Sequence, residues 1–292
     1  MNDAVIWIAG FGDIGLRILQ SEKQGNYVFH TISRAGKNAK SVNGQNITQH
    51  TVDFDKAELP EISGFEAAKV IYLAPPPPTG MADTRIEKFL SHYGSKIEKF
   101  VLISTTGVYG DCKGEWIDEN CVPKPATPRA IRRLSAEQQV ISWSSRYGRA
   151  HVILRVPGIY AQDRLPLARL RRGDPVIRKD QAPFTNRIHA DDLATICLTV
   201  VESNRENLIV NVTDGNPLTM TEYFNAIADA VGLKRPPEID LEYAGGQLSS
   251  GMLSYVRESR RIRNGKLLTE FPITLRYPKL ETTLNTLKSS LT

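Results

Sequence analysis

The sequence predicts an α/β fold built on a doubly wound parallel sheet, with a smaller C-terminal substrate lobe beside it. Short apolar runs recur along the first half of the chain and alternate with segments of helical periodicity, as expected for strands joined by helical crossovers. A glycine-rich turn directly follows the first of these runs. The 292 residues, of which 41% are hydrophobic, are enough to build a large core.

Five apolar runs are expected to be strands buried on both faces of the sheet. They span residues 5–9, 28–32, 70–74, 100–103 and 152–156. Between the third and fourth runs, a helix face is formed at i, i+3, i+4 and i+7 by Ile86, Phe89, Leu90 and Tyr93. Later in the chain, Asp191 or Asp192 is expected to cap one helix. Thr219 and Glu222 have the capping-box spacing of another.

The glycine-rich turn has the form GxGxxG and consists of Gly10, Phe11, Gly12, Asp13, Ile14 and Gly15. It follows a predicted strand and opens a predicted helix, which is the context of a dinucleotide-binding Rossmann unit. The glycines permit a tight turn, close approach of a pyrophosphate, and packing of the helix on the strand. The alternative is a glycine-rich turn without a ligand. We expect residues 1–156 with 187–213 to form an NAD(P)-binding core, and residues 157–186 with 214–292 a substrate-binding lobe.

The end of the second strand favours NADP(H) over NAD(H). Ser33 and Arg34 stand where NAD-binding proteins usually place an acid, and Lys37 follows. A guanidinium can form charge-assisted hydrogen bonds with a 2′-phosphate. The alternative is a solvated basic loop. Asp53 follows a further strand, where it either faces the adenine or only ends that strand.

Composition restricts the class of protein further. The net charge is only +5 and no zinc or helix-turn-helix motif is present, so we do not expect nucleic-acid binding. The three cysteines are far apart, which predicts no metal site and no disulfide framework. No apolar run is long enough to span a membrane. We therefore expect a cytoplasmic protein. Arginine-rich stretches at 164–179, which includes Arg172, and 257–266 are either solvated loops or anion-binding segments.

Four segments resemble the extended short-chain dehydrogenase/reductases of the epimerase/dehydratase branch. They are residues 102–110 (LISTTGVYG), 154–160 (LRVPGIY), 186–194 (NRIHADDLA), and 211–214 (NVTD) with Pro217. The resemblance covers roughly residues 4–232. It implies that Thr105 takes the position of the family's catalytic hydroxyl, which hydrogen-bonds to the substrate. It also implies cofactor contacts from Ala74, Pro75, Pro157 and Ile159.

The family's Tyr-x-x-x-Lys pair is absent at the position that the resemblance indicates. Alignment places Arg129 where the family has Tyr and Arg133 where it has Lys. Arginine does not readily release a proton near neutrality, so Arg129 cannot replace a phenol as general acid/base. We expect Arg133 to hold the cofactor and Arg129 the substrate. The alternative is that both lie with Glu137 on a solvated helix face, where Arg133 pairs with Glu137.

Another residue is then needed to carry a proton, and Tyr109, Asp111, Glu115 and His189 are the candidates. Tyr109 and His189, which we also assign to the substrate site, could instead be ordinary packing residues. The expected protein is an atypical NADP(H)-binding oxidoreductase that acts on a small anionic, nucleotide-sugar-like substrate, and a homodimer is the expected assembly. One alternative is a non-catalytic NADP(H)-binding redox sensor or partner-binding module. Another is a relic fold without a cofactor, which the intact glycine turn opposes.

Overall fold

The computed structural model describes residues 4–21, 27–34, 41–42, 45–248 and 250–291. Its centre is an eight-stranded sheet, in which seven strands are parallel and β3 joins one edge in the antiparallel sense. This confirms the predicted fold class. From edge to edge the strands are β13 (Leu208–Asn211), β8 (Ala150–Val156), β6 (Ile97–Thr105), β5 (Ala68–Tyr72), β1 (Ala4–Ala9), β2 (Tyr27–Ser33), β4 (Gln45–Thr51) and β3 (Ser41–Val42).

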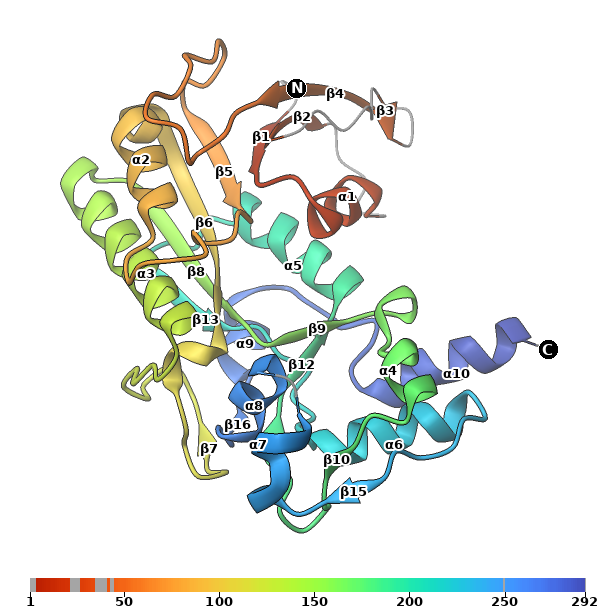
Figure 1. Cartoon of the computed structure of the whole chain (residues 1–292). Helices are drawn as coiled ribbons and strands as arrows, with labels where there is room; N and C mark the ends of the chain where they lie inside the picture. The colour runs from red at the N-terminus through yellow and green to blue at the C-terminus, as the bar shows by residue number, and fades with distance from the viewer. Residues whose placement is uncertain (1–3, 22–26, 35–40, 43–44, 249, 292) are drawn as a thin grey trace.

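Helices cover both faces of the sheet, as Figure 1 shows. On one face lie α1 (Asp13–Gln20) and α5 (Ala190–Glu202), whose apolar side chains share a core with one side of the strands. On the other face lie α2 (Thr84–Tyr93) and α3 (Pro128–Tyr147), in a second core. The predicted helical residues Ile86 and Phe89 are fully buried in that second core. The two cores fix the sheet from both sides.

The strand order reverses beside β1, which pairs with β2 on one side and β5 on the other. In open α/β sheets a ligand binds at the carboxyl ends of the strands where such a reversal occurs. The glycine turn leaves β1 at this point, and the loop that follows β5 faces it. The topology therefore places the predicted phosphate loop at the crevice between β1 and β5.

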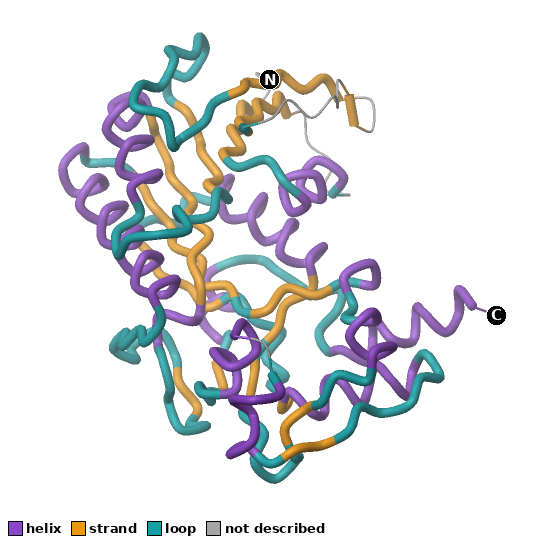
Figure 2. The backbone as a smooth tube through the Cα atoms, in the orientation of Figure 1, coloured by secondary structure: helices purple, strands orange, loops and turns teal. Residues whose placement is uncertain are grey.

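The lobe beside the sheet consists of short elements, visible in Figure 2 as brief strands among loops. Its strand pairs are β9 (Gly158–Tyr160) with β12 (Arg187–His189), β10 (Val176–Ile177) with β15 (Glu238–Ile239), and β11 (Phe184–Thr185) with β14 (Leu218–Thr219). Its helices are α4 (Leu167–Arg172), α6 (Met220–Ala230), α7 (Ala244–Gln247), α8 (Ser250–Val256) and α10 (Leu280–Leu291). Side chains from these helices form a third core.

The remaining elements connect the sheet and the lobe. β16 (Arg261–Ile262) pairs with β7 (Trp116–Ile117), and α9 (Gly265–Glu270) packs on the α5 side through Leu267. Four 3-10 turns are η1 (Gly94–Lys96), η2 (Thr106–Tyr109), η3 (Gln162–Arg164) and η4 (Leu241–Tyr243). Within the described residues, no helix combines the length and apolar character that a membrane crossing requires.

One predicted helix cap is correct and another is wrong. The capping box of α6 is present, because Thr219 Oγ1 accepts from the Glu222 N–H at 3.2 Å and Glu222 Oε2 accepts from the Thr219 N–H at 3.0 Å. At α5, however, His189 rather than Asp191 or Asp192 is the N-cap, and its Nδ1 lies 3.2 Å from the Asp191 N–H. Both aspartates lie in the first turn of the helix, where a negative charge interacts favourably with the positive end of the helix dipole.

Candidate cofactor and substrate site

The three glycines of the turn differ in what surrounds them. Gly10 has φ of +89°, and a Cβ there would lie 2.3 Å from the Ala74 N. A Cβ on Gly15 would lie 2.7 Å from the Phe11 ring. Around Gly12, by contrast, the nearest atom is the Gly10 carbonyl oxygen at 3.9 Å. The first and third glycines are thus required by the fold, while the second leaves space beside the backbone for a ligand.

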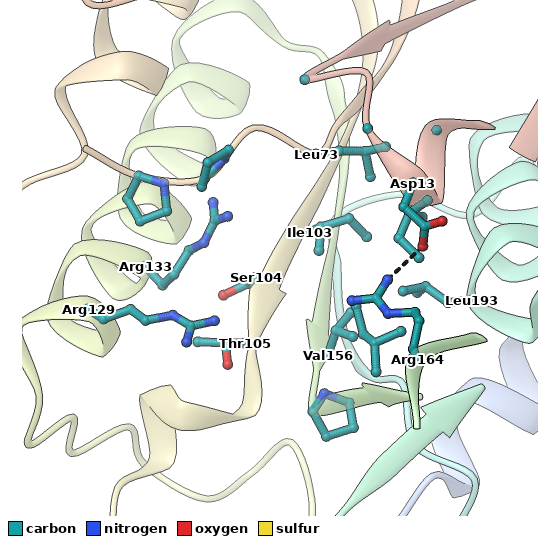
Figure 3. Close-up of a pocket in the computed structure, with 18 residues that line it drawn as sticks. Asp13, Leu73, Ile103, Ser104, Thr105, Arg129, Arg133, Val156, Arg164 and Leu193 are labelled. Atoms are coloured by element: carbon teal, nitrogen blue, oxygen red, sulfur yellow. Dashed lines mark hydrogen bonds and ion pairs between the residues drawn. The ribbon is translucent and has the colours of Figure 1, made fainter. Parts of the chain in front are cut away.

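The start of α1 opens onto a cavity of about 450 Å³. Gly12 is the N-cap of this helix and makes no side-chain cap hydrogen bond, so the first N–H groups are suited to an anion. The predicted residues that line the cavity, several of which Figure 3 labels, are Gly10, Gly12, Asp13, Ile14, Gly15, Pro75, Thr105, Arg129, Arg133, Pro157 and Ile159. The residues present fit a bound dinucleotide.

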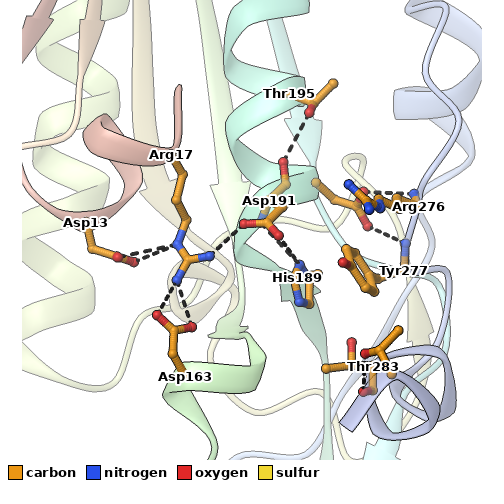
Figure 4. Close-up of polar contacts among 11 residues, drawn as sticks. Asp13, Arg17, Asp163, His189, Asp191, Thr195, Arg276, Tyr277 and Thr283 are labelled. Atoms are coloured by element: carbon orange, nitrogen blue, oxygen red, sulfur yellow. Dashed lines mark hydrogen bonds and ion pairs between the residues drawn. The ribbon is translucent and has the colours of Figure 1, made fainter. Parts of the chain in front are cut away.

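A network of ion pairs joins the glycine turn to the lobe (Figure 4). Arg17 binds Asp13 on its own helix, Asp163 of η3 at 2.6 Å and Asp191 of α5 at 2.6 Å. Beside it, Arg164 Nη1 lies 2.6 Å from Asp13 Oδ2 and lines the 450 Å³ cavity. Asp13 and Arg164 therefore place one negative and one positive group in the cavity wall, beside the start of α1.

A smaller cavity of about 230 Å³ adjoins the first at Gly10, Gly12 and Pro75. Its other predicted lining residues are Phe11, Ser33, Arg34 and Ala74. Lys37 lies outside the described residues. Asp53 does not line this cavity, whereas its neighbours Val52 and Phe54 do. The Asp53 carboxylate accepts the Asp55 N–H at 3.1 Å.

Arg85 also lines the small cavity, and it is not among the site residues predicted from the sequence. Its Nη2 binds Asp55 Oδ2 at 2.5 Å, and its Nη1 donates to the Pro75 carbonyl at 3.0 Å. The Arg85 guanidinium, with a smaller contribution from Arg34, lowers the pKa of Asp55. This nearby carboxylate is thus neutralised by Arg85, and Arg34 is left exposed at the cavity.

The structure separates the two arginines that stand at the positions of the family's Tyr and Lys. Arg129 is exposed and lines the cavity, whereas Arg133 is only 8% exposed. Arg133 Nη2 donates to the Ala74 carbonyl at 3.0 Å, and its Nη1 lies 3.8 Å from Asp83 Oδ2. Burial raises the pKa of Asp83 and lowers that of Arg133. Arg133 therefore connects α3 to the loop after β5.

The alternative of a solvated Arg133–Glu137 pair is wrong. Glu137 is 1% exposed and forms an ion pair with Arg155, with Oε2 and Nη2 2.7 Å apart. It also accepts a hydrogen bond from the Ser104 hydroxyl. Helical spacing correctly placed Arg133 and Glu137 on one face of the helix, but that face packs against the sheet instead of water.

Thr105 lies where β6 ends, at the boundary between two cavities. Its Oγ1 accepts the Gly107 N–H at 3.2 Å, which leaves its hydroxyl proton free to be donated to a ligand. Thr105, Arg129 and Pro157 line both the 450 Å³ cavity and a further cavity of about 540 Å³. A molecule in the larger cavity would therefore meet Thr105 where that cavity adjoins the 450 Å³ cavity.

The 540 Å³ cavity lies between α3, the end of β6 and the lobe. Its basic and acidic lining residues are Arg129, Arg132, Arg187, Arg260 and Glu258. Its aromatic and sulfur-containing lining residues are Phe184, Tyr223, Phe224, Tyr255, Met220 and Met252. Pockets of this kind, apolar with a few convergent charged groups, are typical of small-molecule sites.

The structure does not bring three of the predicted substrate residues to these cavities. Tyr109 is 1% exposed and its hydroxyl donates to Asn211 Oδ1 at 2.8 Å, while burial raises its pKa. His189 caps α5 and stacks on Tyr277 with ring centroids 3.7 Å apart, while burial lowers its pKa to about 4. Arg172 lies on the surface and binds Asp174 at 2.6 Å.

The other two proton-carrier candidates also lie elsewhere. Asp111 Oδ1 accepts the N–H groups of Lys113 and Ser259, and Glu115 is exposed. Sequence reasoning missed Arg85, Arg132 and Arg187 as individual lining residues. Arg164 and Arg260 belong to the two arginine-rich stretches noted in the sequence, and that enrichment is the signal that could have identified them.

The fold, with the glycine turn at the reversal of strand order, is that of the doubly wound α/β proteins. The model of the NAD dependent epimerase/dehydratase family matches residues 6–213, and the chain belongs to that family. Among curated proteins, the human dTDP-D-glucose 4,6-dehydratase is 25% identical over 126 residues, which cover 40% of this chain and 36% of that enzyme. The chain spans less than half the length of the curated relatives it matches.

Solved structures match nearly the whole chain. A conserved protein of unknown function from Silicibacter pomeroyi has a TM-score of 0.81 and 23% identity, with 98% of this chain and 99% of that one covered. UDP-glucose 4-epimerase from Thermotoga maritima, solved with UDP-glucose, has a TM-score of 0.71 and 20% identity, with 99% and 100% covered. dTDP-glucose 4,6-dehydratase from Bacillus anthracis, solved with NAD, has a TM-score of 0.73 and 18% identity, with 98% and 96% covered. These likenesses show the fold.

Proposed function

We propose that this protein is an NADP(H)-dependent oxidoreductase of the epimerase/dehydratase type that acts on a small anionic, nucleotide-sugar-like substrate. The observation that supports this proposal most strongly is that three cavities adjoin one another in a row. The 230 Å³ and 450 Å³ cavities share Gly10 and Gly12, and the 450 Å³ and 540 Å³ cavities share Thr105 and Arg129. This arrangement suits an adenosine, a pyrophosphate with nicotinamide, and a substrate, in that order.

The chain's own residues have separate tasks in this proposal. Arg34 binds the 2′-phosphate and the N–H groups at the start of α1 bind the pyrophosphate. Arg164 adds a positive charge at the same place, since it lines that cavity beside Asp13. The relatives solved with NAD support a nicotinamide cofactor; when bound, it supplies a hydride acceptor or donor.

At the substrate, Thr105 donates a hydrogen bond to the reacting oxygen and Arg129 binds an anionic group. Arg133 holds the loop after β5 in place through the Ala74 carbonyl. Related epimerases have been solved with UDP-glucose and with UDP-N-acetylmuramic acid, which supports a nucleotide-linked sugar as the substrate class. We expect the protein to be cytoplasmic and homodimeric; sedimentation would test the dimer.

One observation favours the non-catalytic alternative, a redox sensor that binds NADP(H). Among the described residues that line the 450 Å³ cavity, none is Tyr, Lys or His. A family member without these groups beside the cofactor lacks the usual proton carrier. Partner binding that changes with the oxidation state of the cofactor would support this alternative.

Calorimetry and turnover assays test the proposal together. We expect NADPH to bind more tightly than NADH, and hydride transfer to occur with at least one acidic nucleotide-linked sugar, observed as absorbance change at the nicotinamide. Failure of both coenzymes to bind would contradict the cofactor assignment. Tight binding of NADPH without any turnover would favour the sensor.

A further inference from the structure

Arg187 occupies an unusual position in the wall of the 540 Å³ cavity. It lies on β12, its side chain is 9% exposed, and it lines the cavity. Its guanidinium carbon lies 3.6 Å from the centroid of the Tyr223 ring. Its Nη1 is buried and has no hydrogen-bond partner among the described residues. Contact with the Tyr223 ring therefore positions the Arg187 guanidinium, while its Nη1 donor remains without an acceptor.

No carboxylate in the described part of the chain forms an ion pair with Arg187. The nearest candidate, Asp214, accepts the Asn216 N–H with its Oδ1 at 2.9 Å. Burial raises the pKa of Asp214 to about 7, so it is only partly ionised near neutrality. A buried guanidinium without an ionised partner is unfavourable, and stacking on an aromatic ring offsets only part of that cost. An anion from outside the chain would complete the charge balance.

Two other arginines of this cavity, Arg260 and Arg132, already have protein partners for at least one donor. Arg260 Nη1 binds Glu258 Oε2 at 2.7 Å and donates to the Gly110 carbonyl at 2.6 Å. Arg132 Nη1 donates to the Gly80 carbonyl at 2.7 Å, although its Nε has no partner among the described residues. Arg187 has no such protein acceptor within the described part of the chain, and Arg129 is exposed at the cavity, so these two arginines, from β12 and α3, are the ones best placed to bind a ligand.

We propose that Arg187, held flat by Tyr223, is a binding site for a carboxylate or phosphate group of the substrate. This inference rests on the proposed function and deepens it, because it makes the substrate an acid with an anionic group on the lobe side of the cavity. Thr105 and Arg129 meet the same molecule from the sheet side. The planar guanidinium suits a two-oxygen contact with either group.

The test uses the full chain with inorganic phosphate and malonate as probes, titrated by calorimetry. We expect saturable millimolar binding of at least one probe to the unmodified protein, and about tenfold weaker binding to Arg187→Met. Arg187→Lys keeps the positive charge but loses the planar, two-donor geometry of the guanidinium, so we expect its affinity for the probe to be intermediate. Whichever probe binds more tightly identifies the group. Arg169→Met is the matched control, since Arg169 stacks on Phe224 in the same lobe but does not line the cavity.

Thermal melting without ligand separates a binding role from a structural one. We expect Arg187→Met to melt at the same temperature as the unmodified protein or higher, because it removes an unpaired buried charge. If Arg187→Met does not fold, Tyr223→Leu replaces it and is expected to weaken probe binding severalfold.

Two outcomes would overturn the inference: no binding of either probe to the unmodified protein, or unchanged affinity in the variants. NADPH affinity, measured on the same preparations, should stay within about twofold of the unmodified value. Loss of NADPH binding in the unmodified protein would instead contradict the proposed function, so the two failures are distinguishable.

Discussion

Arg133 and Asp83 face each other across the interface of α3 and α2, with Nη1 and Oδ2 3.8 Å apart. Asp83 is fully buried and is the N-cap of α2, where its Oδ1 accepts the N–H groups of Arg85 and Ile86 at 3.2 Å. The pair therefore joins the start of α2 to the second turn of α3, behind the loop after β5 that lines the 450 Å³ cavity.

Removal of Arg133 should destabilise the protein. Arg133→Met leaves the Asp83 carboxylate buried without its cation, and we expect the free energy of unfolding to fall by about 2 kcal/mol in urea titrations. The double variant Arg133→Met with Asp83→Asn should recover part of this loss, because the amide can still cap α2 without a charge. Equal stability of the single variant and the unmodified protein would show that the pair contributes nothing.

Arg34 should determine the choice between the two coenzymes. Replacing it in Arg34→Glu removes the bonds to a 2′-phosphate and adds repulsion, so NADPH affinity should fall by at least about tenfold. The carboxylate can accept from a free ribose hydroxyl, so NADH affinity should change little or increase. Calorimetry with both coenzymes measures the ratio. Equal affinities in the unmodified protein would refute the role assigned to Arg34.

Gly10 should tolerate no side chain. Gly10→Ala combines a φ of +89° with a Cβ 2.3 Å from the Ala74 N, so the turn must move and NADPH binding should be lost. Gly148→Ala is the matched control, with a φ of +61° and no atom within 4 Å of the new Cβ. It should cost only about 1 kcal/mol of stability and leave NADPH affinity unchanged. Similar behaviour of the two variants would mean that contact with Ala74 is unimportant.

Asp214 should make stability depend on pH below neutrality. Its pKa is about 7 in the folded chain, against 3.8 for an unperturbed group. Between pH 4 and 7 the folded state keeps a proton that the unfolded state has lost. The contribution of Asp214 to the free energy of unfolding therefore falls as pH rises, by up to about 1.4 kcal/mol per pH unit.

Asp214→Asn should remove this slope while it keeps an acceptor for the Asn216 N–H. Urea titrations at pH 4.5 and pH 7 give the difference between variant and unmodified protein. Asp174→Asn, which changes an exposed partner of Arg172, is the control and should alter the profile little. Parallel pH profiles for Asp214→Asn and the unmodified chain would contradict a raised pKa.

Arg164 should contribute to binding of the pyrophosphate. Arg164→Ala should weaken NADPH about tenfold, because it removes a cation from the wall beside Asp13. The affinity for 2′-AMP, which has no pyrophosphate, should stay within about twofold. Arg178→Ala, in an exposed pair with Asp180, serves as the control. A parallel loss for both nucleotides would place the effect of Arg164 elsewhere in the cleft.

Much of the sheet could be predicted, because strands buried on both faces consist almost entirely of apolar residues and can be recognised as apolar runs in the sequence. β1, β5 and β8 are of this kind, and most of their residues are buried. β4 is not among the five apolar runs, since its sequence QNITQHT has Ile47 as its one apolar residue, and only the placement of Asp53 after a further strand implied it. β4 lies near the edge of the sheet and is held there by its pairing with β2. A pairing between distant segments leaves no pattern in the local sequence.

The site could be predicted where its residues belong to a contiguous motif and not where they meet across the fold. The glycine turn and Thr105 are of the first kind. Arg85, Asp83 and Arg187 are of the second, because their roles depend on partners 30 or more residues away, such as Asp55 for Arg85. Periodicity showed which helix face Glu137 occupies, but only the structure shows that Arg155 is its partner.

Residues 258–263 return from the C-terminal part of the chain to pair with β7, where the Arg261 N–H donates to the Glu115 carbonyl at 3.0 Å and the Arg263 N–H to the Ile117 carbonyl at 2.9 Å. Glu258 and Arg260 reach the 540 Å³ cavity from this returning segment, and Tyr255 reaches it from α8, just before the segment. On the ribosome, the strands of the sheet emerge before it. A nascent chain should therefore complete the walls of the cavity at the glycine turn first, and those of the 540 Å³ cavity only after residues 255–260 have left the ribosome.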